Sequence, residues 1–264
     1  MEFLRIAKRR SLLSEVIYIL LNLALVGAVV GAVIATGTPW LAIAFVLLSK
    51  WRVFAVRPRY WLAHIETNTV DLIVGVGLVV LMYVVGQSGS SLALGVQLVL
   101  AVLYALWLLV LKPRSKRLYV VLQAGTAVLV GTLALTSISY EWSSSVLVIA
   151  MWIIGYSSAR HVLSAYSEPS TRLLSLIWGF VFAEIGWLCY HWTIAYTLPF
   201  GAGLKLAQMT IIVLALSFTG ERIYASYAKH EKIVRADVVL PILLSLGIII
   251  VLELFFNAAA IGAV

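Results

Sequence analysis

Nine stretches of predominantly apolar residues follow one another along the chain, separated by short polar connections. An α-helix rises about 1.5 Å per residue, so roughly 20 apolar residues cross the ~30 Å hydrocarbon core of a bilayer. The sequence therefore predicts an all-α fold, a polytopic transmembrane helix bundle of about nine spanning helices. The expected spans are 16–36, 38–55, 69–86, 92–111, 118–137, 144–163, 172–191, 204–221 and 237–257.

The remaining residues leave no room for a soluble domain. The longest hydrophilic connections, 56–68 and 221–236, are too short to enclose a core of their own. We therefore expect residues 1–264 to form a single integral membrane domain. Hydrophobic residues make up 63% of the chain and charged residues 11%, against about 45–50% and 25% in soluble domains. This composition excludes a soluble globular enzyme, a disordered chain and a disulfide scaffold.

The basic residues fall in alternate connections. All of the 19 lysines and arginines except Lys205 lie in the segments 5–10, 50–59, 112–117, 160–172 and 222–235. Cytoplasmic loops of membrane proteins are enriched in lysine and arginine. The pattern predicts a cytoplasmic N-terminus and an external C-terminus, in the plasma (cytoplasmic) membrane. It also accounts for the net charge of +8, so we expect no nucleic-acid partner.

Glu184 is the acidic residue that the apolar pattern places deepest. It follows Arg172 by twelve residues, about 18 Å along a helix, which is close to the bilayer midplane. An unpaired carboxylate there costs at least about 2.5–3.5 kcal/mol. The sequence therefore predicts either a proton- or ion-linked site or a buried interhelical hydrogen bond. His191, Lys205 and Glu253 lie in the same outer half and are further candidates for an intramembrane polar site, or else make separate structural contacts.

Two features are expected at the inner side. His64, Asn68 and Asp71 are spaced by four and three residues, which puts them on one helical face. This inner polar stripe predicts a vestibule or a lipid-headgroup site, or a solvated helix entry that packs on a neighbour.

The second inner feature is a connection that alternates cations with aromatic residues. Arginine binds phosphates, and tryptophan favours the membrane interface. We therefore expect contacts with anionic phospholipids at the cytoplasmic face. The headgroup candidates are Lys50, Arg52, Arg57, Arg59 and Trp61.

Catalytic and cofactor motifs are missing from the sequence. It has no His-Glu-x-x-His, no Gly-x-Ser-x-Gly, no phosphate-binding glycine loop and one cysteine, Cys189. These absences disfavour an enzyme and predict no catalytic residues, no metal and no cofactor. Three function classes stay open: a small-solute or ion transporter or channel that uses the intramembrane carboxylate; a non-catalytic subunit or scaffold that binds another membrane protein or a second copy; and a lipid-handling protein.

Overall fold

The computed structural model describes residues 12–51, 55, 57–139, 142–192, 195–198 and 204–256. Within them lie nine α-helices, three short helical turns and one two-stranded hairpin. The helices are α2 (Leu12–Thr36), α3 (Trp40–Leu48), α4 (Trp61–Gln87), α5 (Ala93–Leu106), α6 (Arg117–Ile138), α7 (Ser144–Ala165), α8 (Thr171–Trp192), α9 (Gln208–His230) and α10 (Arg235–Val251). The turns are η2 (Pro58–Tyr60, 3-10), η3 (Trp107–Leu111, π) and η5 (Leu252–Phe256, π). Strands β1 (Ala195–Thr197) and β2 (Lys205–Ala207) pair antiparallel. The prediction of an all-α helical bundle is therefore confirmed, whereas the number of membrane spans and their orientation stay predictions.

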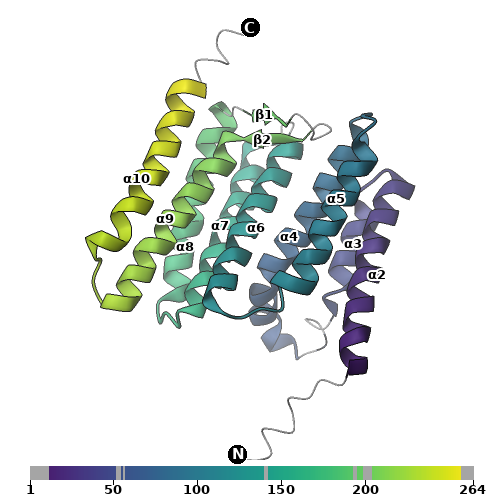
Figure 1. Cartoon of the computed structure of the whole chain (residues 1–264), viewed down its shortest axis with the longest axis horizontal. Helices are drawn as coiled ribbons and strands as arrows, with labels where there is room; N and C mark the ends of the chain where they lie inside the picture. Colours follow the sequence, from purple (N-terminus) through teal and green to yellow (C-terminus); the bar gives the residue numbers. More distant parts are fainter. Residues whose placement is uncertain are drawn as a thin grey trace, which may run out of the picture.

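Successive helices reverse direction from one to the next (Figure 1). The most extensive helix–helix packing joins α7 with α8, α4 with α6, α6 with α7 and α9 with α10. The β1–β2 hairpin lies at the end of the bundle where α8 ends and α9 begins, and we call this the hairpin end. The opposite end is called the charged end. Every lysine and arginine in the described part of the chain, Lys205 excepted, lies in the connections or helix halves at the charged end.

Seven helical segments of the described chain are long and apolar enough to cross a membrane. They correspond to seven of the nine expected spans, with bounds within a few residues for most of them. The other two expected spans, 38–55 and 204–221, are represented by α3 and α9. Helix α3 has only nine residues, about 13 Å. Helix α9 is long enough, with 23 residues, but polar residues at both ends of its apolar run lower its mean hydropathy. It is therefore not among the seven segments.

The two long hydrophilic connections are more helical than the sequence predicted. Helix α4 begins at Trp61, inside the expected connection 56–68, and its early polar side chains bond to its own backbone; Asn68 Nδ2, for example, donates to the carbonyl of His64 at 2.8 Å. Helix α9 continues to His230, inside the expected connection 221–236, and Glu231 then ends it in the left-handed conformation at φ 56°. Charged residues therefore extend these helices beyond the apolar runs.

Two hydrophobic clusters form the core. One joins α2–α5 with part of α6, and the other joins α6–α9. Helices α4 and α6 approach closely where the clusters meet. A Cβ added at Gly77 would lie 2.8 Å from Val130, and one at Gly131 would lie 2.7 Å from Ile73. Small residues allow this approach, as in other membrane bundles.

The outer surface of the bundle is apolar. Large hydrophobic side chains are exposed on all the long helices, which suits contact with lipid tails. Helix α10 packs along α9, where Ser245 donates a hydrogen bond to the carbonyl of Ala215 at 3.0 Å. Most of the α10 surface is exposed, and its buried residues in the described part are Val238, Ser245 and, in η5, Leu252.

Candidate ligand-binding cavity and polar networks

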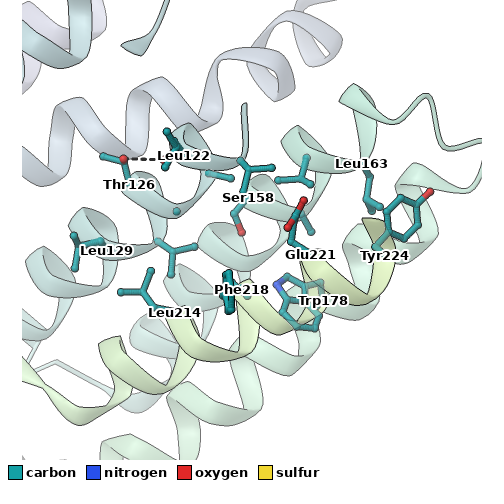
Figure 2. Close-up of a pocket in the computed structure, with 18 of the residues that line it drawn as sticks. Leu122, Thr126, Leu129, Ser158, Leu163, Trp178, Leu214, Phe218, Glu221 and Tyr224 are labelled. Carbon is teal, nitrogen blue, oxygen red and sulfur yellow. Dashed lines mark hydrogen bonds between the residues drawn. The ribbon is translucent and has the colours of Figure 1, made fainter. Parts of the chain in front are cut away.

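A cavity of about 570 Å³ lies between α6, α7, α8 and α9, in the halves of these helices next to the charged end (Figure 2). Its volume falls in the range of ligand pockets, about 300–1,000 Å³. Its wall is mainly apolar. The lining residues are Val121, Leu122, Ala124, Gly125, Thr126, Val128, Leu129, Ser158, Ala159, Val162, Leu163, Leu174, Ile177, Trp178, Leu214, Ser217, Phe218, Gly220, Glu221 and Tyr224.

Small side chains create this space. Gly125 of α6, Ala159 of α7 and Gly220 of α9 all line the cavity. A Cβ added at Gly125 would meet nothing within 4 Å, so this position faces open space. A Cβ added at Gly220 would lie 3.1 Å from the ring of Trp178. The cavity thus follows from small residues that lie at facing positions of long helices.

Glu221 is the acidic residue in the cavity wall. Its side chain is 8% exposed. Tyr166 Oη donates to Glu221 Oε1 at 2.9 Å, and Arg222 Nε lies 2.7 Å from Glu221 Oε2. That ion pair does not have hydrogen-bond geometry, and both Glu221 Oε2 and Arg222 Nε lack a hydrogen-bond partner among the described residues. Ser217, one helical turn before Glu221, also has a buried hydroxyl without such a partner.

Two tyrosines lie at the charged end of the cavity, and one of them, Tyr224, lines it. The rings of Tyr166 and Tyr224 meet edge to face, with centroids 5.0 Å apart. The Arg117 guanidinium lies 4.2 Å from the centre of the Tyr166 ring, and Tyr224 Oη donates to Glu168. Burial, followed by the hydrogen bond to Glu221, raises the pKa of Tyr166 to about 12. The hydrogen bond from Tyr224, followed by that from a backbone N–H, lowers the pKa of Glu168. At neutral pH the tyrosine is therefore protonated and Glu168 ionised.

A second polar network joins α3, α4 and the end of α5. Asp71 Oδ2 pairs with Lys50 Nζ, and with Lys112 Nζ at 2.7 Å. Trp107 Nε1 donates to Asp71 Oδ1 at 2.9 Å. Asp71 and Lys50 are each 8% exposed. Two cations pair with one carboxylate, so this buried network carries a net positive charge.

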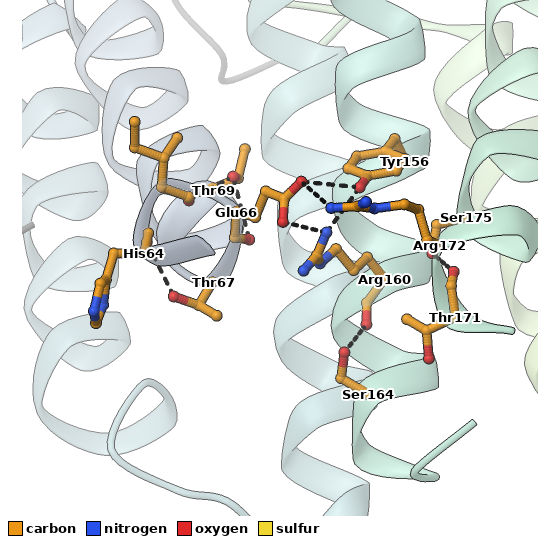
Figure 3. A network of polar contacts seen from close by, with 11 residues as sticks. His64, Glu66, Thr67, Thr69, Tyr156, Arg160, Ser164, Thr171, Arg172 and Ser175 are labelled. Atoms are coloured by element: carbon orange, nitrogen blue, oxygen red, sulfur yellow. Dashed lines mark hydrogen bonds and ion pairs between the residues drawn. The ribbon is translucent and has the colours of Figure 1, made fainter. Parts of the chain in front are cut away.

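A third network lies at the charged end between α4, α7 and α8 (Figure 3). Arg160 pairs with Glu66, and Arg172 Nη2 lies 3.9 Å from Glu66 Oε1. Tyr156 Oη donates to Glu66 Oε1 at 3.3 Å and accepts from Arg160 at 2.8 Å. This network again sets two cations against one carboxylate, and it ties α4 to the α7–α8 pair.

The predicted outer-half residues do not line the cavity. Glu184 is exposed on the surface of α8, on the side away from Gly186, which packs against α7. His191, Lys205 and Glu253 are exposed at the hairpin end. Glu184 precedes His191 by seven residues, about 10 Å along the helix. A shared polar pocket formed by these four residues stays a prediction.

The predicted inner residues have varied surroundings. Asp71 is buried, whereas Asn68 is half-buried and His64 exposed. Lys50, a predicted headgroup ligand, turns inward to Asp71. The remaining headgroup candidates in the described chain, Arg57, Arg59 and Trp61, are exposed, and Arg52 lies outside the described residues.

Sequence reasoning did not select Glu221, Ser217 or Tyr224 of the cavity wall, nor Tyr166, which bonds to Glu221. One signal was present, because Glu221 directly follows an apolar run and is followed by Arg222.

Among the described residues, no group of three or more His, Cys, Asp or Glu side chains could hold a metal ion. Comparison with models of protein families, with curated proteins and with solved structures finds no match to this chain. The geometry nevertheless defines a class: a helical, membrane-type bundle with a pocket of ligand size.

Proposed function

We propose that this chain is a multipass integral membrane protein of the lipid-handling kind, which takes an amphiphile into the cavity between α6, α7, α8 and α9. The observation that carries the proposal is the cavity itself, with its apolar wall and a few polar groups at one end. Pockets of this composition bind molecules with an apolar body and a small polar head. The apolar walls take the tail, and the polar residues near Glu221 take the head.

The charge distribution supports an orientation for this proposal. Lysine and arginine gather on the cytoplasmic side of membrane proteins. The charged end then faces the cytoplasm, the cavity lies at the depth of the cytoplasmic leaflet, and the chain crosses the plasma membrane nine times. These nine crossings add the short helix α3 and helix α9 to the seven long apolar segments. Exposed Arg57 and Arg59 are placed to contact anionic phospholipids.

A cavity-filling substitution tests the proposal. Gly125→Phe adds a ring where the structure has open space, and Gly95→Phe on α5 is a matched control, since a Cβ there also meets nothing within 4 Å but does not line the cavity. Lipids that remain with the purified protein are measured by native mass spectrometry. We expect the wild type and Gly95→Phe to retain an amphiphile that Gly125→Phe loses. Equal retention by both variants would contradict the proposal.

A second candidate function is binding to another membrane protein or to a second copy. Helix α8 exposes Leu173, Ile177, Phe180, Glu184 and Leu188 along one face. In lipid this face would hold a carboxylate against hydrocarbon, which costs free energy. A neighbouring helix with a hydrogen-bond donor would remove that cost. Transport through Glu184, the other reading of this residue, has less support because Glu184 does not line the cavity.

A further inference from the structure

We propose that a phospholipid of the surrounding bilayer enters the cavity from the side, through a mouth between α6 and α9, and places one acyl chain inside while its head stays at the charged end. This inference rests on the proposed function, because it assumes that the cavity holds an amphiphile. It adds the class of ligand, a lipid that is already part of the bilayer, and the route by which that ligand arrives.

The cavity is open over part of its wall. Leu122 and Leu129 of α6 and Phe218 of α9 line the cavity, and yet they are 48%, 40% and 42% exposed. Deeper in the wall, Val128 is 0% and Ser158 is 4% exposed. A side chain that lines a cavity and is also widely exposed lies where the cavity meets the outer surface. Leu122, Leu129 and Phe218 therefore form the rim of a mouth.

The packing of α9 places this mouth on the side of α6. A Cβ added at Gly220 would lie 3.1 Å from the ring of Trp178, so this edge of α9 packs on α8. Phe218 precedes Gly220 by two residues, about 200° around the helix axis, and so lies on the edge away from that contact. Leu122 and Leu129 are seven residues apart, about 10 Å along one face of α6. Figure 2 shows these residues of α6 along one edge of the cavity and Phe218 along another.

The mouth opens onto the lipid-facing surface of the bundle. Its three rim side chains are apolar, and Leu118, one turn before Leu122 on α6, is 64% exposed. An acyl chain that passes this rim leaves hydrocarbon on one side and meets an apolar wall on the other. It therefore exposes little apolar surface to water on the way, which would cost free energy.

The head of the lipid has a place outside the cavity. Arg222 follows Phe218 by one turn toward the charged end, and its guanidinium lies 5.7 Å from the centre of the Phe218 ring. The Arg222 side chain is 42% exposed, and arginine suits the phosphate of a lipid head. A phospholipid beside the rim therefore keeps its head at the depth of Arg222, and only its chain moves sideways.

The test uses phosphatidylcholine with a photoreactive diazirine in one acyl chain. The full-length protein is irradiated in nanodiscs that contain this lipid, and mass spectrometry maps the attachment sites. Two acyl chains hold the probe in the bilayer, so it reaches the cavity only from the side. We expect attachment to the α7 wall of the cavity, at Ser158, Ala159 and Val162. Attachment to exposed Leu240 and Leu243 of α10 is the internal standard for lipids around the protein.

Three variants locate the mouth. Leu122→Trp combined with Leu129→Trp narrows it and should lower the ratio of α7 to α10 attachment several-fold. Leu118→Trp combined with Leu98→Trp is the matched control, because both leucines are exposed but do not line the cavity, and the ratio should not change. Ile177→Trp tests the α8 side, since Ile177 lines the cavity and is exposed there, and it should also keep the ratio. Circular dichroism checks that all variants keep their helical content.

The outcomes separate this inference from the proposed function. An unchanged ratio in the α6 pair, or a loss confined to Ile177→Trp, would overturn the inference. Attachment to the α7 wall by a photoreactive fatty acid but not by the phosphatidylcholine would also overturn it, and would leave the proposed function standing. Attachment to that wall by neither probe would overturn the proposed function itself.

Discussion

Replacing Asp71 by asparagine should strongly destabilise the protein. The substitution keeps the shape of the side chain, and its oxygen can still accept from Trp107 Nε1. It removes the negative charge between Lys50 and Lys112. The Lys112 side chain is 35% exposed and can turn toward solvent, but Lys50 is buried. The ammonium of Lys50 is then left without its counter-ion.

The expected magnitude follows from this burial. Removing one partner of a buried ion pair costs about 3–5 kcal/mol, because the other charge stays buried and uncompensated. The equilibrium constant for unfolding should therefore rise roughly 10²- to 10⁴-fold. Replacing a whole buried pair by groups of similar volume is often neutral. Lys50→Met combined with Asp71→Asn should therefore recover most of the lost free energy of unfolding.

The assay is reversible unfolding in mixed micelles, in which the fraction of sodium dodecyl sulfate is raised stepwise. Circular dichroism monitors the loss of helix at each step. Asp237→Asn is the matched control. Its carboxylate lies 3.3 Å from His230 but is 39% exposed, so its loss should cost less than about 1 kcal/mol. A loss below 1 kcal/mol for Asp71→Asn would refute the reasoning. So would a double variant no more stable than the single one, since Lys50 would then not be the source of the cost.

Two further predictions concern α7 and α8. A Cβ at Gly155 would lie 2.6 Å from a buried ring on α8, so Gly155→Ala should cost about 1–3 kcal/mol in the same unfolding assay, whereas Gly247→Ala, with nothing within 4 Å, should be neutral or slightly stabilising. If the exposed face of α8 contacts another protein, Glu184→Cys in a Cys189→Ala chain should form a cross-linked species in native membranes, and Ala183→Cys, which is buried, should not. Equal cross-linking at the two positions, or none at position 184, would count against this contact.

The spans were predictable from sequence because hydropathy is a local property. Runs of about 20 apolar residues identify a helix wherever it later packs. The lengths of α3 and α9 were less predictable. Helix α3 ends at Leu48, and Lys50, two residues further on, pairs with Asp71, a residue 21 positions away. Helix α9 continues past Glu221, whose carboxylate accepts from Tyr166 and pairs with Arg222. Hydropathy contains neither set of contacts.

The candidate site was harder to predict than the fold. Asp71 and Lys50 were both singled out, but their pairing requires the relative placement of three elements. Glu184 was expected to act inside the bundle, and the structure puts it outside. A sequence signal for this did exist: Gly179 and Gly186 lie on the opposite side of α8, and small residues mark the packed face of a membrane helix.

The π turn η3 carries an evolutionary consequence. Its five-residue bond, from Lys112 N–H to the carbonyl of Trp107 at 2.8 Å, brings both side chains to Asp71. Deleting one residue from η3 would restore α-helical geometry and rotate Lys112 by about 100° around the axis. Lys112 would then face away from the carboxylate. A lineage that has built this network cannot lose the extra residue without losing a counter-ion, so we expect the length of α5 plus η3 to vary less among descendants than its sequence does.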